Sequence, residues 1–80
     1  MTLANAVALR IQSVLDSKKI TLYRLERNSG ILHGTLMTLM SGKTKNVTLK
    51  TIMQIARGFD MTLLEFLDDD LFRRDDLEID

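Results

Sequence analysis

Apolar residues recur at intervals of three and four through most of this 80-residue chain, and this period favours helices throughout. No stretch alternates between apolar and polar residues as a half-buried strand does, and no proline is present to interrupt a helix. The periodic stretches predict helices at residues 2–16, 22–28, 32–40, 49–58 and 63–67. The predicted fold class is therefore all-α, a compact domain of five helices joined by short loops.

Residues with helix-capping side chains stand in front of these stretches. A threonine hydroxyl at such a position can accept a hydrogen bond from a free backbone amide of the first turn. The predicted caps are Thr2, Thr21, Thr48 and Thr62. Glu65 follows Thr62 at the spacing of a capping box. Gly30 is predicted to end the second helix, because glycine adopts the left-handed conformation at low cost.

The apolar side of each predicted helix gives the expected core. Its members are Val7, Ile11, Val14, Leu15, Leu22, Leu25, Ile31, Leu36, Leu39, Met40, Leu49, Ile52, Met53, Ile55, Ala56, Met61, Leu63, Phe66 and Leu67. Met37 is expected to be exposed, in contact with either DNA or a protein. Beyond Asp70, a short helix, a strand and a contact with a partner all remain open.

Charge divides the chain at residue 67, although the formal net charge is zero. Residues 1–67 carry nine bases and four acids, and residues 68–80 carry seven acids and two bases. We therefore predict a mildly basic domain at 1–67 and an acidic C-terminal tail at 68–80. A basic body is compatible with DNA binding, and the tail is either a solubilising segment or an interaction segment.

The chain lacks the sequence features of several other protein classes. It has no cysteine, so it has no disulfide and no thiolate metal site. We see no signal peptide and no apolar run long enough to span a membrane, and expect a cytoplasmic protein. No glycine-rich nucleotide loop, zinc motif or carboxylate pair is present, so we predict neither an enzyme nor a cofactor, metal or small-molecule site.

A short helix, a glycine turn and a second helix are predicted between residues 21 and 42, an arrangement that leaves the second helix projecting. In and around it the chain resembles the Xre-like family, helix-turn-helix transcriptional regulators related to phage repressors and Cro. The resemblance covers about residues 7–67. It depends on Leu25, Leu39, Phe59 and the segments 20–21, 29–31, 35–36, 41–43, 48–52, 55–56, 61–63 and 65–67.

The resemblance implies a double-stranded DNA partner and a recognition helix at about residues 32–41 in the major groove. The implied base-reading residues are His33, Gly34, Met37 and Thr38. The implied phosphate contacts are Tyr23, Arg24, Thr35, Ser41, Lys43, Lys45 and Asn46. An imidazole and a threonine hydroxyl can both bond to base edges, whereas a glycine lets the backbone come close. The alternative for His33 is an ordinary surface histidine.

Several positions depart from the family pattern. Leu22 and Leu32 stand where relatives often have polar residues, and Glu26 stands where a small residue is usual. We predict that the carboxylate of Glu26 caps the free amides of the third helix, which Leu32 cannot do. Leu15 and Met40 replace a buried arginine–glutamate pair of some phage repressors, so no single charge is left buried.

Two functions follow from the sequence. The first is a sequence-specific DNA-binding regulator, expected to repress as a homodimer through residues 63–79. The second is a protein-interaction module that has the fold but does not read DNA. Zero net charge, Gly34, the expected exposure of Met37 and the apolar residues of the tail favour the second function.

Overall fold

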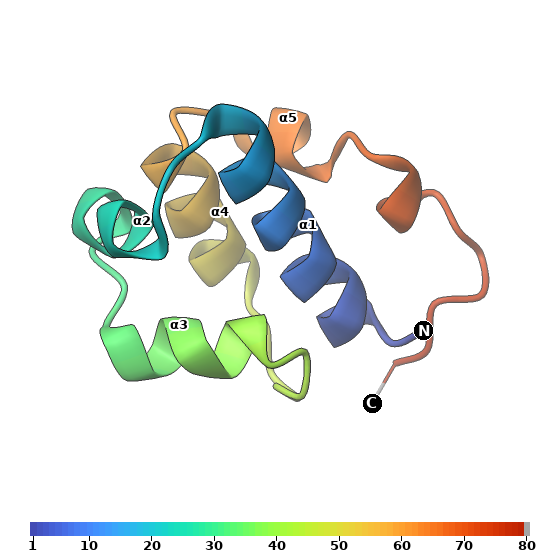
Figure 1. Cartoon of the computed structure of the whole chain (residues 1–80). Helices are drawn as coiled ribbons and strands as arrows, with labels where there is room; N and C mark the ends of the chain where they lie inside the picture. Colours follow the sequence, from blue (N-terminus) through green and yellow to red (C-terminus); the bar gives the residue numbers. More distant parts are fainter. Residues whose placement is uncertain (80) are drawn as a thin grey trace.

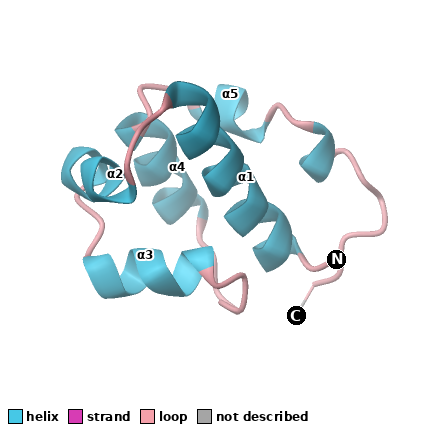
Figure 2. Ribbon diagram, in the orientation of Figure 1, coloured by secondary structure: helices cyan, strands magenta, loops and turns pink. Residues whose placement is uncertain are grey.

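The computed structural model describes residues 1–79. Within that range the elements are α1 (Leu3–Lys18), α2 (Leu22–Ser29), α3 (His33–Met40), α4 (Leu49–Gly58), α5 (Leu63–Leu67) and the 3₁₀ turn η1 (Asp70–Phe72). Figure 1 shows α1 in the middle and α3 along the lower edge, and α4 packs against α2 and α5. The described residues form helices and loops without a strand, as Figure 2 shows, so the all-α prediction is confirmed.

Threonine hydroxyls cap four of the helices, as the sequence predicts. Thr2, Thr21, Thr48 and Thr62 each accept from the backbone amide three residues later. Glu65 completes the capping box, because its carboxylate accepts from the amide of Thr62 at 2.8 Å. These local bonds explain why α2, α4 and α5 begin where they were predicted to begin.

Helix α1 is longer than predicted, because it continues past Asp16 to Lys18. The apolar stripe ends at Leu15, but a helix does not need a buried side chain in its last turn. It ends at Lys19, whose φ of 55° is left-handed. The stripe therefore marked the packed part of this helix and not its full length.

All five α-helices contribute buried side chains to the core. Phe59 and Phe66 are 1% and 0% exposed, and their rings stack with centroids 6.4 Å apart. The predicted core is mostly confirmed, with Leu22, Met40, Met61, Leu63 and Leu67 partly buried against it. Two members are wrong: Leu49 is 69% and Met53 39% exposed. Ile52, Ile55 and Ala56 already fill the buried face of α4, so Leu49 and Met53 lie on its outer side.

The turn between α2 and α3 depends on Gly30, whose φ of 74° is left-handed. Its amide donates to the carbonyl of Glu26 and closes the helix. At the other end of α3, Gly42 also has a left-handed φ, of 71°, and its carbonyl accepts from the side-chain amide of Asn5 at 3.1 Å. The two glycines allow the sharp changes of direction at both ends of α3, while the Asn5 bond ties its far end to α1.

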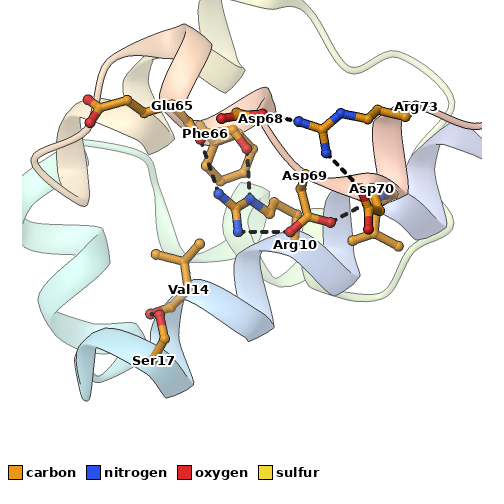
Figure 3. A network of polar contacts seen from close by, with 10 residues as sticks. Arg10, Val14, Ser17, Glu65, Phe66, Asp68, Asp69, Asp70 and Arg73 are labelled. Atoms are coloured by element: carbon orange, nitrogen blue, oxygen red, sulfur yellow. Dashed lines mark hydrogen bonds and ion pairs between the residues drawn. The ribbon is translucent and has the colours of Figure 1, made fainter.

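Arg10 of α1 holds the segment after α5 against the body, as Figure 3 shows. Its guanidinium donates to the carbonyls of Phe66 at 2.7 Å and Glu65 at 3.1 Å, and to the carboxylate of Asp69 at 3.2 Å. It also lies 5.6 Å from the centre of the Phe66 ring. The acidic segment thus begins as a packed part of the molecule.

Further along, the tail returns to the N-terminus. The amide of Leu3 donates to the carbonyl of Glu78, and the amide of Glu78 donates to the carbonyl of Met1, both at 3.0 Å. These two bonds form an isolated parallel bridge between Thr2 and Glu78. The sequence leaves a short helix, a strand and a partner contact open beyond Asp70. The structure has a short 3₁₀ turn there, followed by this single bridge. Asp80, the last acid of the predicted tail, lies outside the described residues.

None of the helices in the described part of the chain has the length and apolar character that crossing a membrane requires.

Candidate DNA-binding surface

The outer face of α3 is open to solvent. Leu36 and Leu39 are buried against the core, whereas the predicted base-reading residues His33, Gly34 and Thr38 are exposed. Thr35 and Ser41, predicted phosphate contacts, are exposed on the same helix and directly after it. In Figure 1 α3 runs along the lower edge, with α2 near its start and the 41–48 loop at its end. These five residues thus lie on one exposed element.

Met37 is not the exposed residue that the sequence predicts. It is half-buried, between the core side of α3 and its outer face. One turn of helix separates it from Met40, which packs against the core. Only part of the Met37 side chain is therefore available for contact with DNA or a protein.

The hydroxyls on the outer face bond to their own helix. Thr38 Oγ1 donates to the carbonyl of Gly34 at 2.9 Å, and Ser41 Oγ donates to that of Thr38 at 2.6 Å. Ser41 Oγ also accepts from the amide of Lys43 at 3.3 Å. Because its hydroxyl hydrogen is used, Thr38 can meet a partner as an acceptor or through its methyl group.

Gly34 leaves an open space on this face. A Cβ built at this position meets no atom within 4 Å outside its neighbours. The position therefore has room for a side chain, so packing within the protein does not explain the glycine. Its absence of a side chain lets another molecule approach the backbone of α3 closely.

Glu26 has a different partner from the one predicted. Its Oε2 lies 2.9 Å from Nδ1 of His33, and Leu32 contributes no side-chain cap to α3. The prediction that Glu26 caps the backbone amides of α3 is wrong. Its carboxylate instead contacts the imidazole ring of His33, the first residue of α3. The pair links α2 to the exposed start of α3.

On α2, Tyr23 and Arg24 are exposed, as their predicted contact with phosphate requires. They line one hollow with Lys19 and Arg27, and no carboxylate lines it. Arg27 Nη1 donates to the Tyr23 hydroxyl at 3.1 Å, and its guanidinium lies 5.8 Å from the ring centre. Sequence reasoning missed Arg27, although its spacing of four residues from Tyr23 places both on one side of a helix.

The loop after α3 presents Lys43, Lys45 and Asn46 to solvent. Among residues 1–79, no ion pair involves Lys43, Lys45 or Arg24. By contrast, Arg73 and Arg74 of the tail pair with tail aspartates. The basic groups next to α3 therefore remain available to an anionic partner.

The two apolar replacements of the buried charge pair fit the packing. Leu15 is 6% exposed and Met40 packs partly against the core. Leu22 likewise packs partly against the core, so it does not reach outward as a polar residue would. In the described part of the chain, no group of three or more metal-binding side chains comes together.

The family model of the Cro/C1-type HTH DNA-binding domain matches residues 10–70, which is more than three quarters of the chain. This range contains α2, α3, the loop after α3 and α5. No curated protein and no solved structure matches the chain. With its capped helices, its glycine turn and the exposed face of α3, the chain belongs to the Cro/C1-type helix-turn-helix DNA-binding domain family.

Proposed function

We propose that this protein is a sequence-specific transcriptional regulator, acting as a repressor, that places α3 in the major groove of double-stranded DNA. The observation that carries the proposal is the exposed outer face of α3, flanked by cations on α2 and in the following loop that make no ion pair within residues 1–79. An α-helix with its side chains is about 10–12 Å across, close to the width of the major groove, so α3 can enter it.

In this proposal the residues of α3 read bases and the residues around it contact phosphate. His33 and Thr38 would meet base edges, Gly34 would allow a close approach, and Met37 would add apolar contact. The phosphate contacts would be Tyr23, Arg24, Thr35, Ser41, Lys43, Lys45 and Asn46. Phosphate contacts determine affinity and register, whereas base contacts determine sequence preference.

We further propose a homodimer through residues 63–79, acting in the cytoplasm. One copy makes few base contacts, and two copies of α3 about 34 Å apart would read a pseudo-palindromic site. Leu64 of α5 supports this interface, because this apolar residue is 80% exposed. Light scattering after size exclusion would test it: Leu64→Asp should turn a dimer into a monomer, while Leu49→Asp, also at an exposed leucine, should not.

The test of DNA binding is a selection from random duplex DNA at low salt. We expect a pseudo-palindromic sequence to be enriched. Lys43→Ala and Lys45→Ala should weaken binding to all sequences equally and each reduce the salt slope by about 1. His33→Ala or Thr38→Ala should change the preferred sequence. Failure to enrich any sequence would contradict the proposal.

A second candidate is the protein-interaction module, and exposed leucines near α3 favour it. Leu32, directly before α3, is 77% exposed, and Leu49, at the start of α4, is 69% exposed. If a partner protein covers them, Leu32→Ser should abolish its binding. If DNA is the partner, the same change should alter affinity for DNA much less than Lys43→Ala does.

A further inference from the structure

The contact between Glu26 and His33 joins an anchored side chain to an exposed one. The carboxylate of Glu26 is 19% exposed, whereas the imidazole of His33 is 68% exposed. The backbone of Glu26 is fixed in α2, where its carbonyl accepts from Gly30. The carboxylate therefore holds the ring by Nδ1, and the opposite edge of the ring, with Nε2, remains open to solvent.

The chemistry of this contact determines which ring nitrogen carries hydrogen. An ionised carboxylate only accepts hydrogen bonds, so Nδ1 of His33 must be the donor. A neutral imidazole carries one hydrogen, and Nε2 is then left as an acceptor. Without the carboxylate, either nitrogen could carry the hydrogen.

We propose that Glu26 is a positioning residue that fixes the tautomer of His33, so that Nε2 accepts a hydrogen bond from a base amino group. This inference rests on the proposed function, since it concerns the DNA sequence read by α3. In the major groove, amino groups are offered by N6 of adenine and N4 of cytosine. Guanine offers only the acceptors N7 and O6 there, and Nε2 in this tautomer cannot bond to either.

The same geometry explains why a short side chain follows His33. The ring can reach a base edge only if the backbone of α3 comes close to the groove, and Gly34 adds no side chain between them. Glu26 thus selects the base without touching DNA, through the hydrogen that it holds on Nδ1.

The tautomer is tested on the full chain without DNA. His33 is the only histidine, so a ¹⁵N NMR spectrum of the imidazole nitrogens contains one ring. In spectra recorded at a pH high enough to leave a single hydrogen on the ring, we expect that hydrogen on Nδ1 and none on Nε2. Glu26→Gln and Glu26→Ala should move hydrogen toward Nε2, and Glu78→Gln, the matched control, should not. Hydrogen on Nε2 in the unchanged protein, or an unchanged tautomer in both Glu26 variants, would overturn the proposal.

The base preference is tested on the sequence that the selection enriches. At the position whose preference is lost in His33→Ala, adenine is replaced by purine, or cytosine by 2-pyrimidinone, which removes the amino group. We expect affinity to fall about three- to tenfold, the loss of one hydrogen bond. The same base replacement should not change the DNA affinity of the His33→Ala variant, because the base change and the mutation remove the same interaction.

The outcomes separate the inference from the proposed function. If no sequence is enriched, the proposed function fails, while the NMR spectrum still decides the tautomer. If a sequence is enriched but 7-deazaguanine, which lacks N7, weakens binding at the His33 position, the inference fails and the function stands. The inference also fails if Glu26→Gln and Glu26→Ala keep the full preference at that position.

Discussion

At the scale of single residues, Arg10 determines how the segment after α5 attaches to the body. Its guanidinium serves the carbonyls of Glu65 and Phe66 and the carboxylate of Asp69, and its side chain is 13% exposed. The two carbonyls belong to the end of α5, where the carbonyl of Glu65 also accepts from the amide of Asp68 at 3.3 Å. A side chain from the first helix therefore completes the hydrogen bonds of the fifth.

Arg10→Ala should lower the free energy of unfolding by about 1.5–3 kcal/mol, because charged hydrogen bonds to half-buried acceptors are lost. Urea denaturation followed by circular dichroism would measure this. Arg10→Lys keeps the charge but not the planar fork, so it should recover only part of the loss. Equal stability of the alanine variant and the unchanged protein would show that these bonds add nothing.

Gly34→Ala separates folding from DNA binding at one position. The open space around Gly34 accommodates a methyl group, and alanine favours a helix, so the domain should gain about 0.5–1 kcal/mol. Affinity for the enriched DNA should nevertheless fall if α3 approaches the groove closely. Ser13→Ala, on the exposed side of α1, is the control for a change to alanine away from this face. Undiminished DNA binding by Gly34→Ala would rule out the close approach.

At the scale of elements, α2 and α4 pack closely at Gly58. A Cβ there would lie 2.9 Å from Leu25 Cδ1, 2.9 Å from Ser29 Cβ and 3.2 Å from the Ser29 amide nitrogen. Gly58→Ala should therefore destabilise the domain by about 1–3 kcal/mol, although alanine is the better helix former. The same substitution at Gly34 should have the opposite sign. A thermal melt of both variants checks this, and a Gly58→Ala melt at or above the unchanged one would contradict it.

The capping box gives α5 a dependence on pH. Hydrogen bonds from the backbone amide and side chain of Thr62 lower the pKa of the Glu65 carboxyl. A carboxyl with a lowered pKa in the folded state stabilises the fold above its unfolded pKa, and this stabilisation is lost as the pH falls through the folded pKa. The contribution is therefore complete at neutral pH and is lost progressively as the pH falls from the usual glutamate pKa through the lowered one.

Glu65→Gln should remove this part of the acid sensitivity, because an amide accepts from the Thr62 backbone at any pH. Stability curves between pH 2 and 7 for both proteins should therefore converge at the acid end. Parallel curves would mean that Glu65 does not titrate with folding. Thr62→Ala, which removes the other half of the box, should lower stability at every pH in this range.

At the scale of the whole molecule, the acidic tail lies next to the basic loop that we propose as a phosphate contact. Lys45 and Asn46 line one hollow together with Glu78 and Ile79. The bridge between Thr2 and Glu78 holds the tail there by backbone bonds. A negative charge at this place repels DNA phosphate and attracts the lysine that should meet it.

Glu78→Gln should therefore raise DNA affinity about two- to fivefold at low salt, and less at high salt, where exposed charges are screened. Asp60→Asn is the matched control. It removes one negative charge after the C-terminal end of α4, whereas the basic loop precedes the N-terminal end. Asparagine also tolerates the left-handed φ of 59° at this position. An equal gain from both variants would indicate an effect of net charge alone.

The sequence by itself determined the helices, their caps and most of the core. Each is a local property: Thr2, Thr21, Thr48 and Thr62 bond to amides three residues away, and the spacing of apolar residues defines one face of a helix. Most of the predicted surface residues, such as Thr38 and Lys43, followed from the same spacing and the family resemblance.

Only the tertiary structure decided which contacts form between elements far apart in sequence. The spacing on α4 could not exclude Leu49 from the core, because exclusion depends on where α2 and α5 pack. The partner of Glu26 depended on the angle between α2 and α3, and the bonds of Arg10 join residues more than fifty positions apart. Sequence patterns encode which face of a helix is buried, whereas the packing of the faces determines which side chains meet.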